Sequence, residues 1–361
     1  MEDKRCIVNS IKGWQFSETD IADAIRGEKM LNPSIDLTNS CNLNCPYCYI
    51  ETKDSTKKVR KPNELSLEET LKIIDELVSA GAKTINIVGA GEPTIDPHFK
   101  EVVSHIFQKG LTTVLFTNGI KLATDDTLVD FLYEKDVSLI VKLNSRDSLV
   151  QDLLAGKRGY SKERDKALAR LIEKGFNQGK VTRLGVDTLA LNDNYDELIE
   201  IHKECRKNNI FPIIADYIPT GRTEGGIFVG YNAVGNIYNE KSEIIEAIKH
   251  LIPITNGRRK DLLKDIESID KSFNVNRDDH IAYYGGGKCT QQLGLYIDIE
   301  GNIYPCVARK IINNHKKYDG KLGNYRAGDS ITDIWNNHDY IKIVRKEYNG
   351  GCPYKPQLKF I

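Results

Sequence analysis

Residues 35–218 alternate between short apolar segments and amphipathic ones, and this alternation limits the folds open to the chain. Six segments read as strands: 35–38, 84–88, 113–116, 138–143, 183–190 and 210–218. The segments between the later strands have helical periodicity: 66–78, 99–109, 127–134, 162–174 and 196–208. Strands joined through helices need right-handed crossovers, which place them in a parallel sheet. The pattern predicts an α/β fold, either an open sheet or a partial barrel.

Several of the predicted strands end in polar or glycine-containing runs. The second ends in Gly89-Ala-Gly-Glu-Pro93, the third in Thr117-Asn-Gly119 and the sixth in Pro219-Thr-Gly-Arg222. The carboxyl ends of parallel strands lie at one edge of a sheet, and α/β folds bind their ligands there. We therefore expect the functional site at this edge.

Composition and charge exclude some classes of partner. The 361 residues carry 51 basic and 51 acidic side chains, so no net field attracts nucleic acid or an anionic membrane. The first residues lack the apolar stretch of a signal peptide, and no apolar run approaches the roughly 18 residues that span a bilayer. A cytoplasmic protein that binds neither nucleic acid nor membrane is expected.

Eight cysteines are the residues most informative about chemistry. In a long chain without a secretion signal, metal ligation is favoured over disulfides. Cys6 and Cys205 stand alone and are expected to be ordinary core or surface residues. We expect the other six to bind metal: Cys41, Cys45, Cys48, Cys289, Cys306 and Cys352.

Three of these cysteines, Cys41, Cys45 and Cys48, lie on one loop directly after the first predicted strand. Three thiolates can bind three irons of a cubane iron–sulfur cluster and leave the fourth iron without a protein ligand. A zinc site is the alternative, but closed zinc sites need four ligands, and the first histidine in the chain is His98. The spacing favours the cluster.

This spacing, CxxxCxxC with the aromatic Tyr47 before the last cysteine, resembles the signature of the radical SAM superfamily. The resemblance implies a partial (β/α)6 radical SAM barrel. It also implies that S-adenosylmethionine (SAM) binds the open iron and is cleaved, by an electron from the cluster, to a 5′-deoxyadenosyl radical that abstracts a substrate hydrogen. A reducing partner such as flavodoxin or ferredoxin is implied as well.

Further strand ends resemble the SAM-binding motifs of that superfamily. Ala90-Gly91-Glu92-Pro93 looks like its GGEP motif, with alanine at the first glycine, and the resemblance assigns Gly91 and Glu92 to the SAM amino group. Asn118 lies at the matching end of the third strand, although it could equally be the left-handed residue of a turn. After the fourth strand, Lys142 suits the SAM carboxylate and Asn144 the ribose hydroxyls, and a solvated lysine with a turn asparagine is the alternative.

The C-terminal cysteines resemble those of a second iron–sulfur domain. Residues 294–306 alternate in hydrophobicity around a Glu-Gly-Asn turn, which predicts a β-hairpin, with Cys289 before it and Cys306 at its end. With Cys352 this resembles the SPASM and shorter twitch extensions, which implies an auxiliary [4Fe-4S] cluster. Twitch matches better, because a full SPASM domain needs further cysteines. Lys355 replaces the last cysteine of a closing CxxC pair, so the sequence does not identify the fourth ligand of the auxiliary cluster.

Candidate catalytic residues lie at the sixth predicted strand. Pro219-Thr-Gly-Arg222 resembles a segment common in SPASM and twitch enzymes, which implies that Arg222 faces the substrate as an anion anchor or proton acceptor. A structural salt bridge is the alternative for this arginine. Asp216 is the second catalytic candidate, and Asp187 and Tyr217 lie near the same edge.

We therefore expect an α/β chain in four parts. An N-terminal helical cover spans 1–34, the radical SAM partial barrel 35–222, a connector 223–285, and a small α+β twitch domain with a β-hairpin 286–361.

Three functions are open on the sequence alone. The expected one is radical oxidation or epimerisation of a small molecule of the aminocyclitol or sugar type. Maturation of a ribosomal peptide is the alternative; it is less favoured because only 34 residues precede the barrel, too few for the leader-binding domain that peptide maturases often carry. A non-catalytic iron–sulfur or zinc protein is the third.

Overall fold

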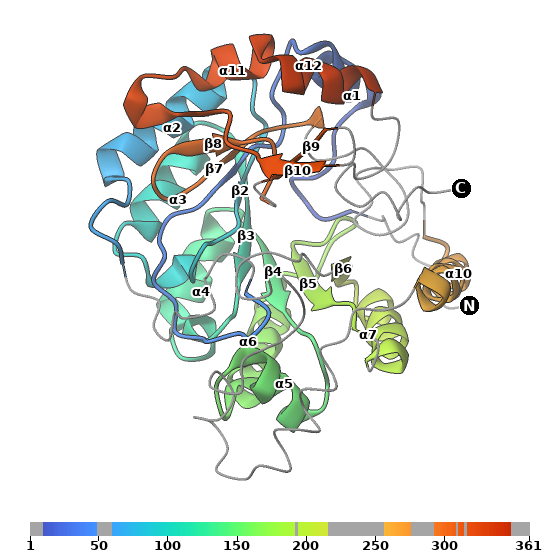
Figure 1. The fold of residues 1–361 in the computed structure, drawn as a ribbon. Coiled ribbons are helices and arrows are strands. Elements are labelled where there is room, and N and C mark those ends of the chain that lie inside the picture. Colours follow the sequence, from blue (N-terminus) through green and yellow to red (C-terminus); the bar gives the residue numbers. More distant parts are fainter. Residues whose placement is uncertain are drawn as a thin grey trace.

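Six parallel strands form the centre of the molecule. The computed structural model describes residues 10–48, 60–191, 194–215, 256–275, 292–307, 310–313 and 316–347. The strands are β1 (Ser34–Ile35), β2 (Thr84–Ile87), β3 (Thr112–Thr117), β4 (Ser138–Lys142), β5 (Leu184–Leu189) and β6 (Phe211–Ala215). Each pairs in parallel with the next, and Figure 1 shows β2 to β6 in this order. The predicted α/β fold with a parallel sheet is confirmed.

Amphipathic helices connect these strands and cover the outer face of the sheet. They are α2 (Leu67–Ser79), α3 (Phe99–Gln108), α4 (Asp126–Glu134), α6 (Tyr160–Lys174) and α7 (Tyr195–Lys207), with short 3-10 turns η1 (Pro93–Ile95) and η2 (Lys121–Ala123). Helix α2 is typical: Ser66 caps it in a capping box, and its buried side chains join one core with those of β2 and β3. Burial of each such side chain stabilises the fold by about 1.5–3 kcal/mol.

The C-terminal hairpin extends the same sheet. Strand β7 (Tyr296–Ile297) pairs in parallel with β1, and β8 (Asn302–Tyr304) and β11 (Gly323–Asn324) follow in antiparallel order. The nine strands therefore run β11-β8-β7-β1-β2-β3-β4-β5-β6. Strands β9 (Lys310–Asn313) and β10 (Lys316–Asp319) form a separate antiparallel pair. The expected hairpin is present, and its first strand lies beside the strand that leads into the cysteine loop.

Three helices lie outside the predicted pattern. Two of them, α11 (Ile331–Asn337) and α12 (Asp339–Glu347), are separate because His338 between them is extended. The backbone N–H of Tyr340, at the start of α12, donates to a ring nitrogen of His338 at 3.2 Å. Helix α5 (Ser148–Ala155) was not predicted at all.

Two further helices cover the ends of the molecule. Helix α1 (Glu18–Arg26) lies beside α12, and α10 (Asn256–Ser272) packs on α7 (Figure 1). Leu262 and Ile266 of α10 share a buried cluster with Leu198 of α7. Of the predicted connector 223–285, the structure describes only residues 256–275.

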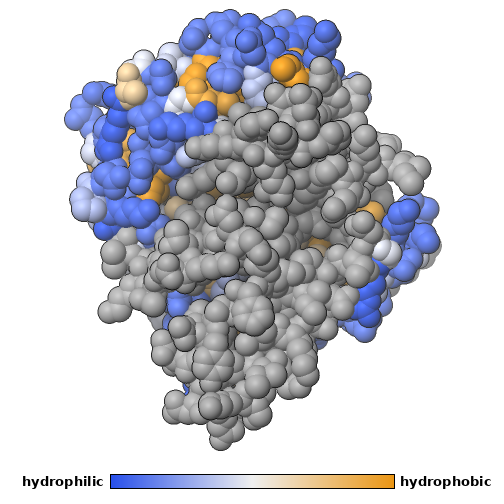
Figure 2. Space-filling view, viewed as in Figure 1, coloured by the Kyte–Doolittle hydropathy of each residue, from blue (hydrophilic) through white to orange (hydrophobic). Residues whose placement is uncertain are grey.

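The described surface over α2 and α11 is mainly hydrophilic, with small separate hydrophobic patches (Figure 2). Within the described ranges, no helix combines the length and the apolar character needed to cross a bilayer.

Candidate active site

The cysteine loop is held on one side by Gly91. Strand β1 ends at Ile35, earlier than the expected 35–38, although the Asp36 N–H still donates to the Ile297 carbonyl at 3.0 Å. The Gly91 N–H donates to the Thr38 carbonyl at 2.8 Å, and the Glu92 N–H donates to the Ser40 carbonyl at 2.7 Å. A Cβ on Gly91 would lie 1.9 Å from the Ser40 oxygen. Glycine is required here because two backbones meet.

On its other side the loop is held by the end of helix α5. The Asn44 N–H donates to the Ala155 carbonyl at 3.0 Å. Gly156 ends the helix at φ 65°, and a Cβ there would lie 2.2 Å from the Asn44 oxygen. Sequence reasoning missed this support. The available signal was an N-cap and a C-cap at helical spacing: Asp147 caps the first turn, and Gly156 ends the helix after eight helical residues.

The loop forms part of the wall of a cavity of about 400 Å³ at the carboxyl ends of the parallel strands. Cys41, Cys45 and Cys48 line this cavity, and so does Cys306, which follows β8. The backbone N–H of Leu43 points at the Cys41 sulfur at 3.5 Å. An N–H donor beside a sulfur stabilises the thiolate, which is the form that binds iron.

The arrangement of the three loop cysteines suits an iron–sulfur cluster. Within the described parts of the chain, no group of three or more His, Cys, Asp or Glu side chains converges on a single point, and nothing about the cluster rests on that finding. A cubane makes a different demand, since each thiolate binds its own iron and the sulfurs need not converge on one point. The three cysteines on one loop, with an amide directed at one sulfur, fit that demand.

Glu92 lines the same cavity and is almost fully buried. One carboxylate oxygen accepts from the hydroxyls of Thr94 and Thr117, each at 2.7 Å, and the other accepts from the Asn118 N–H at 2.7 Å. Burial raises the pKa of Glu92 above its usual value despite these donors. A bound cation would favour the ionised form, so this wall suits an ammonium group.

Asn118 connects the end of β3 to the cysteine loop. Its side-chain NH2 donates to Asn42 at 2.7 Å. The left-handed residue of this turn is Gly119, at φ 81°, so the alternative reading of Asn118 as that residue is wrong. Tyr160 supports the same point from α6, because its hydroxyl donates to the Asn118 carbonyl at 2.9 Å. No pattern in the sequence marked this tyrosine.

Lys142 lines the cavity beside Asp187. Its ammonium lies 2.7 Å from one oxygen of Asp187 and 5.4 Å from the centre of the Tyr47 ring. The other oxygen of Asp187 is buried and has no hydrogen-bond partner among the described residues. Sequence reasoning noted Asp187 only as lying near this edge, and the pairing with Lys142 follows from the neighbouring positions of β4 and β5.

Asn144 lies behind the cavity wall instead of in it. Its side-chain NH2 donates to the Tyr47 hydroxyl at 2.7 Å, and its oxygen accepts from the Leu189 N–H at 2.9 Å. The side chain is fully buried and is absent from the residues that line the cavity. This arrangement does not favour the predicted contact with ribose. Asn144 instead holds Tyr47, beside the last cysteine of the loop.

The remaining predicted site residues lie outside the described residues. These are Cys289, Cys352, Asp216, Tyr217 and Arg222. Their predicted roles stay predictions.

Comparisons with known proteins agree with the geometry of this site. The family model of the radical SAM superfamily matches residues 35–205, and the SPASM model, an iron–sulfur cluster-binding domain, matches residues 289–354. The mycofactocin maturase MftC of Mycolicibacterium smegmatis is 32% identical over 327 residues, which cover 88% of this chain and 73% of that protein. The chain therefore belongs to the radical SAM superfamily.

Other similar proteins differ in what they act on. An S-adenosylmethionine-dependent nucleotide dehydratase of Flammeovirga pacifica is 24% identical over 278 residues, covering 74% of this chain and 92% of that protein. SuiB of Streptococcus suis has a similar fold: its structure with a bound precursor peptide, SuiA, has a TM-score of 0.59 and 17% identity, covering 91% of this chain and 70% of SuiB.

Membership of this family defines the class of protein. It is a radical SAM enzyme, so the reading as a non-catalytic metal protein is set aside. The two domains imply SAM and two [4Fe-4S] clusters as its cofactors. The matching C-terminal model is that of SPASM, and the shorter twitch form stays a prediction.

Proposed function

We propose that this enzyme matures a peptide, by abstracting hydrogen from a residue held between the cysteine loop and the C-terminal hairpin. One cavity lined both by the three loop cysteines and by Cys306 carries this proposal. Similarity to a maturase across 88% of the chain supports a peptide over a small molecule, and so does the fold shared with SuiB, which binds a precursor peptide.

Within this proposal, Cys41, Cys45 and Cys48 hold the SAM-binding cluster, and Cys306 contributes to the auxiliary one. When bound, the cluster and SAM supply hydrogen-atom abstraction through a 5′-deoxyadenosyl radical. Glu92 favours the SAM amino group, because its buried carboxyl gains a counter-charge there. Lys142, at the end of β4, offers its ammonium group to the SAM carboxylate, and Asp187 orients that ammonium group.

Apolar side chains line the same cavity as these polar groups. Val88, Phe116, Ile140, Leu189 and Ile213 line the cavity from successive strands. Such a lining excludes water around a reactive radical, which prevents its quenching by solvent and leaves the substrate as the nearest hydrogen donor.

The first experiment tests the reaction. Anaerobically reconstituted protein, reduced with dithionite and given SAM, is expected to release 5′-deoxyadenosine. It should contain about eight irons per chain if both clusters form and about four if one forms. Stoichiometric zinc in place of iron, with no cleavage of SAM, would refute the proposal.

The second experiment tests the substrate. Short peptides encoded beside the gene are incubated with the reduced enzyme and SAM, and their masses are measured in light and heavy water. We expect a peptide to lose two hydrogen atoms in mass, or to keep its mass in light water and gain deuterium in heavy water if it is epimerised. An unchanged peptide would count against maturation.

A small-molecule substrate is the second candidate, and the similarity to a nucleotide dehydratase favours it. It includes oxidation or epimerisation of an aminocyclitol or sugar. The same assay, run with nucleotides or an aminocyclitol in place of peptide, decides between the two. Release of 5′-deoxyadenosine stimulated by the small molecule alone would support this candidate.

A further inference from the structure

The segment 60–69 lies between the cysteine loop and the C-terminal hairpin and touches both. On the loop side, the Glu64 carboxylate accepts from the Asn39 N–H at 2.8 Å, two residues before Cys41. The same oxygen accepts from the Lys61 N–H at 2.8 Å. The Glu64 side chain is completely buried, so these hydrogen bonds are shielded from water.

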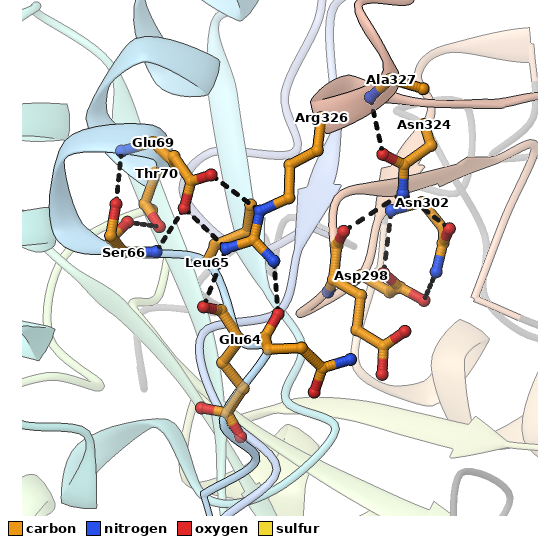
Figure 3. Close-up of polar contacts among 12 residues, drawn as sticks. Glu64, Leu65, Ser66, Glu69, Thr70, Asp298, Asn302, Asn324, Arg326 and Ala327 are labelled. Carbon is orange, nitrogen blue, oxygen red and sulfur yellow. Dashed lines mark hydrogen bonds and ion pairs between the residues drawn. The ribbon is translucent and has the colours of Figure 1, made fainter.

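On the hairpin side, Arg326 binds the same segment. Its guanidinium forms a two-pronged ion pair with Glu69, each nitrogen–oxygen distance being 2.7 Å, and donates to the backbone carbonyls of Asn63 and, at 3.0 Å, Glu64 (Figure 3). The planar fork of arginine allows all four contacts at once, which a lysine ammonium does not.

The position of Arg326 is in turn set by the hairpin. Arg326 lies in a 3-10 turn, η5 (Tyr325–Ala327), capped by the side chain of Asn324. Asn324 donates to Asn302 of β8 at 2.8 Å, and Asn302 donates to Asp298 in the hairpin turn at 3.0 Å (Figure 3). The Leu65 N–H also donates to the Ile299 carbonyl of this turn at 2.7 Å. The strand that carries these contacts ends two residues before Cys306.

These contacts form one continuous path from the hairpin to the loop. It passes from Asp298 and Asn302 through Asn324 and Arg326 to the backbone of Glu64, and from the Glu64 carboxylate to Asn39. Asn39 lies next to Ser40, whose carbonyl accepts from Glu92. The backbone at Asn39 and Ser40 therefore supports both the loop cysteines and Glu92, the residue proposed to face SAM.

We propose that Glu64 and Arg326 are positioning residues. Through them, the position of the C-terminal hairpin sets the affinity with which the cysteine loop binds SAM. The proposal rests on the proposed role of Cys41, Cys45 and Cys48 as cluster ligands. Neither residue lines the cavity, so both act through the groups that they hold: Arg326 through Glu69 and the segment backbone, and Glu64 through the Asn39 N–H and an ion pair with Arg60 at 3.2 Å.

The test measures SAM affinity, not turnover. Full-length protein with a reconstituted cluster is titrated with SAM in anaerobic equilibrium dialysis, alongside iron content and thermal stability. Glu64→Leu is expected to weaken SAM binding roughly tenfold, the effect of losing a buried hydrogen bond to a charged group. Glu64→Gln keeps an acceptor oxygen for Asn39 and should restore affinity to within about twofold of the wild type. Arg326→Gln should weaken binding about threefold.

A double variant shows whether Arg326 and Glu64 act along one path or support the cysteine loop independently. If Arg326 acts through Glu64, Arg326→Gln should have no further effect on SAM affinity in the Glu64→Leu background. The matched control is Glu68→Gln, which removes an exposed ion pair with Lys72 on the same helix and touches nothing in the hairpin.

Each outcome is decisive. Additive losses in the double variant would overturn the proposal, as would unchanged SAM affinity in Arg326→Gln together with lowered thermal stability. If Glu64→Leu does not fold, the threefold loss of SAM affinity expected for Arg326→Gln still decides. Wild-type protein that holds no iron or cleaves no SAM refutes the proposed function instead, so the two failures are distinguishable.

Discussion

The cysteine loop is attached to its two neighbouring regions by different means. Toward β2 and α5 it is held by backbone hydrogen bonds at two glycines, Gly91 and Gly156, where no side chain fits. Toward the C-terminal hairpin, β1 before the loop pairs backbone to backbone with β7, and side chains add further contacts, Arg326 with Glu69 and Glu64 with Asn39. Both attachments use backbone hydrogen bonds, but only the second adds charged side chains.

This difference predicts how each attachment responds to change. A backbone contact at a glycine tolerates no added carbon and does not titrate. An ion pair weakens when its acid is protonated or when salt is added. The charged part of the hairpin attachment is therefore the part that we expect to respond to substitution, salt and pH.

The largest expected effect comes from Gly91→Ala. The added Cβ would lie 1.9 Å from the Ser40 carbonyl oxygen, so the loop or the end of β2 must move. We expect iron content after reconstitution to fall by more than half and SAM cleavage to fall by about a hundredfold or more, the scale of a misplacement of about 1 Å.

Gly257→Ala is the matched control for this variant. Gly257 lies in the exposed first turn of α10 with nothing within 4 Å of an added Cβ, so iron content and cleavage should be unchanged. Gly91→Ala with wild-type iron content would show that the loop is not clamped there, and the contrast between the two attachments would fail.

An intermediate effect is expected for Tyr47→Phe. The phenol oxygen accepts from Asn144, which is fully buried, so its removal leaves a buried donor without a partner. We expect a loss of about 1–3 kcal/mol in the free energy of unfolding, with iron content retained. Tyr133→Phe, at a partly exposed ring, is the control and should cost much less. Chemical denaturation measures both, and loss of iron in Tyr47→Phe would show a direct role at the cluster instead.

Local spacing explains why much of the site could be predicted from the sequence. Cys41, Cys45, Cys48 and Glu92 each belong to a short motif at the end of a predicted strand, and parallel strands bring such ends together whatever the details of packing. All four line one cavity, together with Lys142. The hairpin turn was predictable for the same reason.

What could not be predicted depends on pairs that are distant in sequence. Asn144 lies beyond the last residue of β4, where strand periodicity no longer says which way a side chain points, and its amide is used by Tyr47 and Leu189. Arg326 and Glu69 are 257 residues apart, and no pattern in either segment marks the other as its partner. Gly156 and Tyr160 support the loop from elements whose packing the sequence does not reveal.

The smallest expected effect is a pH dependence of the hairpin attachment. Hydrogen bonding to Arg326 lowers the pKa of Glu69 from 4.5 to about 2 in the folded protein. The ion pair therefore stabilises the fold fully above pH 4.5 and progressively less as the pH falls toward 2. We expect wild type to exceed Arg326→Gln by about 1 kcal/mol in unfolding free energy at pH 7. The difference should shrink by roughly half at pH 3, while the effect of Gly91→Ala should not change with pH. A difference between wild type and Arg326→Gln that is constant from pH 7 to 3 would mean that Arg326 acts through its backbone carbonyl contacts alone, and that the attachment to the hairpin does not titrate.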